Sequence, residues 1–182
     1  MRPTRHQLNR KNSSDPFFTN MNVDHILGTL NQCNVRYLLI GGMNFMLRHQ
    51  PILTYDVDLW IEDQEENRRR TEAALSQLDA QWGVTDDDWG EVAQLASGWL
   101  DRQALFCLTS PHGAIDVFRS VAGLDDWETC WNNSSIEEAT AAGTPYRGLS
   151  DEDMLLCQLA LAVESQKKDR ILKLRDSLDR KN

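Results

Sequence analysis

The sequence of 182 residues has no long hydrophobic run. Its apolar stretches, such as 37–40 and 154–156, fall far short of the roughly 20 residues that a transmembrane helix requires. No apolar segment of signal-peptide character follows Met1. We therefore expect a protein without a membrane span, located in the cytoplasm.

Cysteine, proline and glycine are also scarce, with 4 cysteines, 5 prolines and 10 glycines. The cysteines form no Cys-x-x-Cys pair and no Cys/His ligand spacing, which argues against a zinc site or a disulfide framework. The low proline and glycine content excludes a low-complexity chain. The sequence lacks the Gly-x-Ser-x-Gly motif of serine hydrolases. It also lacks the Gly-x-x-x-x-Gly-Lys-Ser motif of P-loop proteins, so both kinds of chemistry are excluded.

Positive charge is scarce: the sequence has 19 lysines and arginines but 28 aspartates and glutamates, which gives a net charge of -9. Such a chain has no long-range attraction to DNA or anionic lipid, so we expect no recognition of DNA sequence. Residues 1–20 depart from this character, because they hold four basic residues and one acidic residue. They predict a flexible basic leader before a single domain over 21–182.

Apolar periodicity predicts an α+β fold. Helical spacing begins at Val23, and the later segment that starts at Ser150 has a capping box with Asp153. That segment is apolar nearly all round, which predicts a buried helix. The predicted helices are 43–48, 64–81, short pieces within 125–142, the segment from 150, and a final amphipathic helix from 167. The predicted strands are 35–40, 54–61, and a hairpin formed by 104–108 and 114–118.

Two aspartates, Asp56 and Asp58, interrupt the apolar strand 54–61. Residues two apart in a strand project from one face, so both carboxylates would point the same way. Neighbouring anions repel one another and favour a cation such as Mg²⁺, which takes oxygen ligands. The same spacing recurs in an acidic loop at 86–88 and at a helix start at 151–153, where acids are common. The alternative for Asp56 and Asp58 is an edge strand whose charges discourage aggregation.

Gly41 and Gly42 form the only Gly-Gly pair, at a predicted junction between strand and helix. Glycine allows close approach of the backbone to a ligand, and a helix N-terminus offers N–H groups to phosphate. A tight turn is the alternative. A third acid, Asp116, lies in the apolar strand 114–118. The chain thus presents, in order, a strand, Gly-Gly, a helix, a strand with two acids, and a later strand with one acid.

This order resembles the nucleotidyltransferase superfamily of polymerase-β-like enzymes. The matching segments are 38–43, 54–59 and 115–117. The small bacterial AbiEii-type toxin group looks most similar, because the tail from 148–155 to Lys168-Asp169 resembles its last helical stretch. The resemblance implies a mixed β-sheet flanked by helices, with the C-terminal helices, about 150–182, packed on it.

The resemblance also implies an Mg²⁺-dependent transfer of a nucleotidyl group from a nucleoside triphosphate to an acceptor hydroxyl, with release of pyrophosphate. Asp56 and Asp58 would coordinate Mg²⁺. Asp116 would complete a two-metal site and help to deprotonate the acceptor. These three residues are therefore the candidate catalytic residues and metal ligands.

Candidate nucleotide-binding residues follow from the same resemblance. Gly41 and Gly42 would hold the β- and γ-phosphates, and Thr54 belongs to the matching strand motif. Arg48 and Lys168 could neutralise triphosphate charge, although an ordinary surface role is the alternative for each. The nucleotide itself is not specified by any local motif.

Near the C-terminus the chain departs from the AbiEii-type pattern. It has Cys157-Gln158 where that group often has a lysine, and Ser165-Gln-Lys167 where basic residues cluster. This departure leaves open a catalytically inactive binding partner, as in a toxin–antitoxin pair with a cognate antitoxin. An antibiotic adenylyltransferase would share the fold and the acids. The acceptor, whether tRNA, protein or small molecule, also stays open.

Overall fold

The computed structural model describes residues 21–124 and 126–180. Within them the α-helices are α2 (Val23–Gln32), α3 (Gly41–Arg48), α4 (Glu65–Gln77), α5 (Trp127–Asn133), α6 (Asp151–Ala160) and α7 (Lys168–Asp179). The strands are β1 (Tyr37–Ile40), β2 (Asp56–Ile61), β3 (Gln81–Trp82), β4 (Gly90–Glu91), β5 (Leu105–Ser110), β6 (Gly113–Phe118), β7 (Ser135–Ala139) and β8 (Pro145–Gly148). The predicted leader over 1–20 lies outside the described residues.

The strands form one mixed sheet in the order β4-β3-β5-β6-β2-β1-β8-β7. The pairs β2–β6 and β1–β8 are parallel, whereas β1–β2 and the hairpin β5–β6 are antiparallel. The predicted α+β class, the mixed sheet and the hairpin are therefore confirmed. Across the described ranges, every helix is too short or too polar to cross a lipid bilayer.

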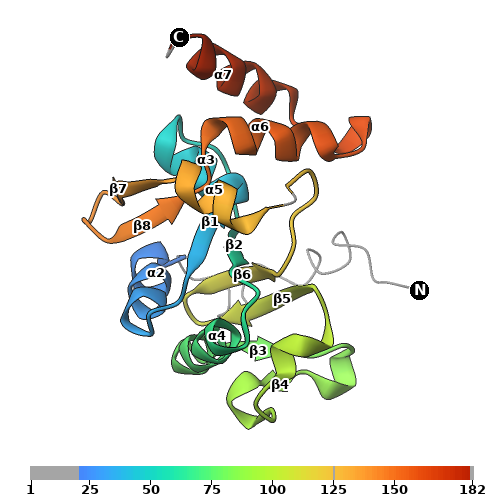
Figure 1. Ribbon diagram of the computed structural model, residues 1–182. Coiled ribbons are helices and arrows are strands. Elements are labelled where there is room, and N and C mark those ends of the chain that lie inside the picture. Colours follow the sequence, from blue (N-terminus) through green and yellow to red (C-terminus); the bar gives the residue numbers. More distant parts are fainter. Residues whose placement is uncertain (1–20, 125, 181–182) are drawn as a thin grey trace.

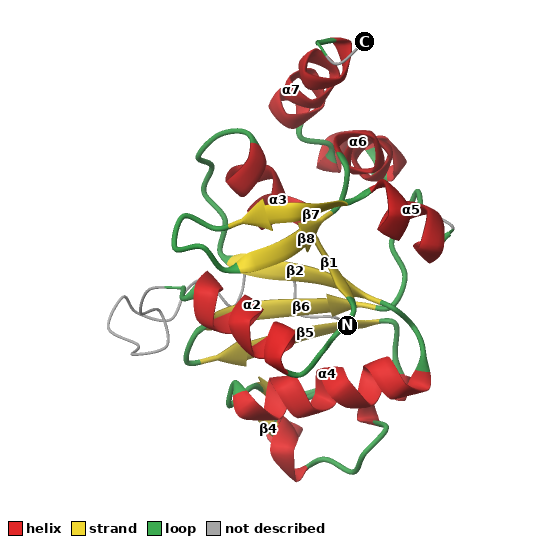
Figure 2. Cartoon of the chain, turned by 60° about the vertical axis from the view of Figure 1, so that its left-hand side comes forward, coloured by secondary structure: helices red, strands yellow, loops and turns green. Residues whose placement is uncertain are grey.

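Each face of the sheet builds its own apolar cluster. Val57 and Leu59 on β2 belong to a cluster with residues of α2 and α4, which Figure 2 shows along one side of the strands. Trp60 belongs to the other cluster, with Met154 of α6 and Leu174 of α7. Figure 1 shows α6 and α7, in orange and red, stacked at one end of the molecule. The C-terminal helices thus pack on the sheet, as predicted.

Helix α6 begins as predicted, because the Ser150 hydroxyl accepts a hydrogen bond from the backbone N–H of Asp153 at 3.1 Å. The prediction that this helix is buried all round is wrong. Leu156 and Leu159 are 46% and 44% exposed. The helix packs on the sheet and on α7, and these two neighbours leave part of its circumference open to solvent.

Several elements differ from prediction in their bounds or type. Helix α4 ends at Gln77 instead of 81, because Asp79 takes a left-handed conformation (φ 51°) and turns the chain into β3. Helix α3 begins at Gly41, two residues early. The stretch 125–142 contains β7 as well as a helix, and β8 follows unpredicted. Both strands are short, and β8 has only 4 residues, so neither carries a clear alternating pattern.

Candidate metal centre

Three aspartates meet where β2 and β6 run in parallel. Asp58 lies directly opposite Asp116 in the register of the two strands, and Asp56 lies opposite Ala114. Residues two apart share a face, so all three side chains project to the same side of the sheet. One carboxylate oxygen from each aspartate lies within 4.8 Å of the other two. We call Asp56, Asp58 and Asp116 the aspartate trio.

The surroundings of the aspartate trio suit a hard divalent cation. Asp116 is only 8% exposed, and Asp56 and Asp58 are half-buried. Crowding three carboxylates into a partly desolvated site raises their electrostatic energy unless positive charge is nearby. Carboxylate oxygens are the ligands that Mg²⁺ takes in proteins. The donor set therefore fits Mg²⁺.

The Gly-Gly pair lies directly beside the aspartate trio. Gly41 has a φ of 65°, and a Cβ atom there would collide with Oδ2 of Asp58. A Cβ atom on Gly42 would come within 2.6 Å of the Thr54 hydroxyl oxygen. Ile40, the N-cap of α3, makes no side-chain capping hydrogen bond. Only glycine therefore fits here, and the N-terminus of α3 lies against the carboxylates.

Thr54 connects the glycines to the aspartates. Its hydroxyl donates a hydrogen bond of 3.2 Å to Oδ1 of Asp56. Thr54 is thus gathered with the trio, as its place in the sequence motif suggested.

Arg170 of α7 also faces this site, and it is a residue that the sequence reasoning missed. Burial lowers the pKa of its guanidinium, while the negative charges of Asp58 and Asp56 act in the opposite direction. A Cβ atom on Gly42 would lie 3.3 Å from Nη2 of Arg170. The guanidinium carbon lies 5.7 Å from the centre of the Phe45 ring. Arg170 therefore brings a half-buried positive charge to the glycine side of the trio.

Lys168 is exposed and lies two residues before Arg170, at the first position of α7. The sequence signal that could have pointed to Arg170 is this same basic run, in which Lys167 and Lys168 precede it. The periodicity of the helix does not by itself tell which of these cations turns toward the sheet.

Arg48 lies at the opposite end of α3 from Gly41. Its Nε atom is 3.1 Å from a carboxylate oxygen of Glu138, and its Nη2 atom is 3.3 Å from Oδ1 of Asp151. It also donates a hydrogen bond of 2.5 Å to the carbonyl oxygen of Leu149. These contacts tie α3 to β7 and α6. The structure therefore does not gather Arg48 with the trio, and its nucleotide-binding role stays a prediction.

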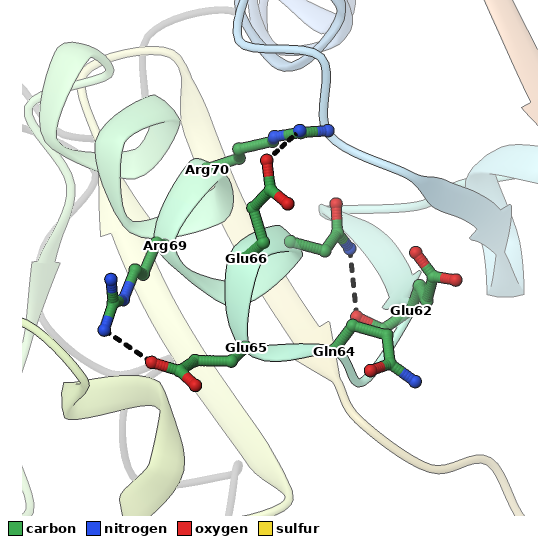
Figure 3. Close-up of a pocket in the computed structure, with 7 residues that line it drawn as sticks. Glu62, Gln64, Glu65, Glu66, Arg69 and Arg70 are labelled. Carbon is green, nitrogen blue, oxygen red and sulfur yellow. Dashed lines mark hydrogen bonds and ion pairs between the residues drawn. The ribbon is translucent and has the colours of Figure 1, made fainter.

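A surface hollow lies elsewhere, at the start of α4. Figure 3 shows the charged side chains that line this hollow. Arg69 forms an ion pair with Glu65 at 2.5 Å, and Arg70 forms one with Glu66. Glu65 and Glu66 each have a cation one helical turn away, and Glu62 pairs with Arg36. The hollow is thus an internally paired helix surface, in contrast to the convergent aspartates on β2 and β6.

Solved structures that resemble the chain over most of its length show the fold class. Over 86% of this chain and 87% of the other, the chain is similar to the crystal structure of ANT(2")-Ia in complex with adenylyl-2"-tobramycin, with a TM-score of 0.56 and 17% identity. The chain has the nucleotidyltransferase fold. The solution structure of the antibiotic-resistance factor ANT(2'')-Ia agrees, with a TM-score of 0.55, 16% identity, and coverage of 88% and 82%.

A second nucleotidyltransferase extends this likeness. The lincomycin-bound lincosamide antibiotic adenylyltransferase LnuA matches with a TM-score of 0.55 and 14% identity, over 86% of this chain and 98% of that one. No family model and no curated protein matches the sequence. The particular closeness to the AbiEii-type group stays a prediction.

Proposed function

We propose that the protein is an Mg²⁺-dependent nucleotidyltransferase that transfers a nucleotidyl group from a nucleoside triphosphate to an acceptor hydroxyl. The observation that supports this most strongly is the convergence of the aspartate trio beside Gly41. The nucleotidyltransferase fold of the chain agrees with it. A catalytically inactive binding partner has less support, because such a protein would not need three converging carboxylates.

The reaction forms one bond and breaks another. The acceptor oxygen bonds to the α-phosphorus, and the bond between the α-phosphorus and the bridging oxygen breaks. Pyrophosphate leaves with the electron pair of that bond. Asp116, the most buried of the trio, would receive the acceptor proton. Asp56 and Asp58 would hold Mg²⁺ together with Asp116, and the ion would offset the charge of the phosphates.

The glycine side of the trio would hold the β- and γ-phosphates. Backbone N–H groups at the start of α3 point outward from a helix N-terminus, which favours an anion. Arg170 adds positive charge on this side. Thr54 would keep Asp56 oriented through its hydrogen bond. Lys168 is exposed at the start of the same helix as Arg170 and could reach the outer phosphates.

A more specific activity, antibiotic adenylylation, is the second candidate. Two of the similar structures carry antibiotic-related ligands, adenylyl-2"-tobramycin in one and lincomycin in the other. Adenylyl transfer from ATP to tobramycin or lincomycin is therefore the first pair of reactions to assay. A toxin or phage-defence role with a cognate antitoxin, and a tRNA or protein acceptor, remain predictions.

Pyrophosphate release from ATP tests the proposal. We expect wild-type protein with MgCl₂ and an acceptor to release pyrophosphate, and Asp56→Ala to lose this activity. Asp86→Ala is the matched control, because Asp86 belongs to another Asp-x-Asp pattern in an exposed turn. Wild-type protein that binds no Mg–ATP and releases no pyrophosphate with tobramycin, lincomycin or total tRNA would contradict the proposal.

The predicted division of the chain is part of the same proposal: residues 21–182 would form the transferase domain and residues 1–20 a leader. A chain that starts at Met21 should then keep its thermal melting temperature and its affinity for Mg–ATP. Loss of either in that truncated protein would place the first 20 residues in the folded domain.

A further inference from the structure

The face of the sheet that carries the trio continues onto β5, where it is open to solvent. Exposed and buried residues alternate strictly along β5. Phe106 and Leu108 are buried in the core on one face, whereas Leu105, Cys107 and Thr109 are exposed on the other. Leu105 is 41% exposed. One face of β5 is therefore exposed to solvent.

The exposed face of β5 is the face of the sheet that carries the trio. Cys107 lies directly opposite Asp116 in the antiparallel register of β5 and β6. Directly opposite residues in such a pair project to the same side, with Cβ atoms about 4.5–5.5 Å apart. Asp58, Asp116 and Cys107 thus form one continuous row across three strands.

The neighbouring positions on this face complete a strip. Thr109 lies opposite Ala114 on one side and Gln81 on the other, and Leu105 lies opposite Phe118. We define the β5 strip by the residues Gln81, Leu105, Cys107, Thr109, Ala114 and Phe118. On the same face of the sheet, the strip adjoins Asp116, the proposed proton acceptor, and extends from it toward β3, away from β1.

The two sides of the trio differ in charge. The glycine side receives Arg170 from α7. The β5 strip contains no charged side chain, and Glu91 of β4 lies opposite Gln81 at its outer end. A nucleic-acid acceptor would need lysine or arginine side chains on the docking surface to pair with its phosphates. A polycationic acceptor would need acidic side chains there to pair with its amino groups. The strip offers apolar surface, a hydroxyl and an amide.

We propose that the β5 strip is the docking surface for the acceptor, and that the acceptor is a small hydroxylated molecule with an uncharged, partly apolar face. This inference rests on the proposed nucleotidyl transfer. The triphosphate occupies the glycine side and the acceptor the β5 side, so that the acceptor hydroxyl lies next to Asp116. Residues 105, 107 and 109 then determine acceptor specificity.

The test compares acceptor classes in one assay. Wild-type protein is incubated with Mg²⁺, ATP labelled at the α-phosphate, and one of three kinds of acceptor. These are the neutral glycosides octyl and phenyl β-D-glucoside, the polyamine triglucosamine, and total tRNA. We expect label on a neutral glycoside. Stronger labelling of triglucosamine or tRNA, or none on either glycoside, would overturn the inference.

Variants of the strip locate the docking surface. Cys107→Trp fills the strip, and Leu105→Glu adds a charge to it. Both should reduce transfer to the glycoside at least 10-fold while binding Mg²⁺ with α,β-methylene-ATP as wild type does in calorimetry. Val163→Trp is the control, because Val163 is exposed between α6 and α7, outside the strip.

The outcomes separate the two proposals. If wild-type protein does not bind Mg²⁺ with the ATP analogue, the proposed function fails. If it binds the analogue and transfers label, but both strip variants transfer at the wild-type rate, the β5 docking surface alone is wrong. Normal analogue binding by either variant shows that it has folded.

Discussion

The Asp-x-Asp pattern occurs at 56–58 and again at 151–153, and the structure uses the two copies differently. Asp151 is buried and is surrounded by donors: His49 at 3.0 Å, the Ser177 hydroxyl at 2.7 Å, and Arg48. Asp153 caps α6 with Ser150. These acids hold the C-terminal end of α3, the start of α6 and α7 together.

The copy at 56–58 faces a third carboxylate from β6 instead. Thr54 donates to Asp56, and the positive charge of Arg170 acts on Asp56 and Asp58 from α7. A buried carboxylate that the protein itself neutralises is part of the framework, whereas carboxylates that converge suit an external cation. The same spacing thus serves stability in one place and ligand binding in the other.

The sharpest test of this contrast exchanges one acid in each copy for its amide. Asp58→Asn should reduce nucleotidyl transfer by about 100-fold or more, because a metal ligand is lost. It should not lower the melting temperature measured without Mg²⁺, since it relieves repulsion within the trio. A substantial fall in melting temperature would show that Asp58 is structural after all.

Asp151→Asn should have the opposite profile. Removing this charge leaves Arg48 and His49 without their shared partner, which should lower the free energy of unfolding by about 3 kcal/mol. Urea denaturation measures the change. At a temperature where the variant is folded, its affinity for Mg–ATP should stay near that of wild type. Unchanged stability would contradict the framework role.

Gly41→Ala should also damage the site more than the fold. The added Cβ meets Oδ2 of Asp58, and φ is 65°. Gly143→Ala is the matched control, because Gly143 has a φ of 87° and nothing within 4 Å of its added Cβ. Both variants should lose about 1 kcal/mol of stability from the left-handed backbone. Only Gly41→Ala should lose transfer activity and Mg–ATP affinity.

Arg170 and Lys168 should differ although they are two residues apart. Arg170→Ala should weaken Mg–ATP binding about 10-fold, because a half-buried cation next to the phosphates interacts strongly. Lys168→Ala should have a smaller effect, since its charge is exposed and screened by salt. Calorimetry with α,β-methylene-ATP measures both. Equal losses would contradict the place given to Arg170 in the site.

The smallest effect concerns the third copy of the pattern, at 86–88. Asp88 accepts hydrogen bonds from the backbone N–H groups of Val84 and Thr85, and these bonds, above all those from Thr85, lower its pKa below the usual 3.8. A lowered carboxylate pKa adds stability above the unfolded value, and this stability is lost as pH falls through the folded value. Asp88→Asn should therefore melt slightly earlier at pH 7, and the difference should shrink below pH 4.

Much of the candidate site could be predicted from sequence because it depends on short-range geometry. The alternation of a strand places Asp56 and Asp58 on one face, and the glycine pair marks the start of α3. That Asp116 would lie opposite Asp58 depends on the parallel pairing of β2 and β6, which join segments about 58 residues apart. The family resemblance implied that Asp116 joins the site, whereas local periodicity could not.

The features missed from sequence all depend on long-range packing. Arg170 reaches the site because α7 packs against the sheet through Leu174, and its local sequence does not reveal that orientation. No acidic residue lies near Arg48 in the sequence, yet in the fold it forms ion pairs with acids on β7 and α6. β8 is too short for a pattern and forms by pairing with β1 and β7.

The most direct test of the account is binding of Mn²⁺, a spectroscopic substitute for Mg²⁺, followed by electron paramagnetic resonance in the presence of α,β-methylene-ATP. Wild type and Asp86→Ala should bind the ion with the same affinity, and Asp58→Asn should lose most of that binding. Equal Mn²⁺ binding by Asp58→Asn and wild type would contradict the claim that residues 56, 58 and 116 form a metal centre.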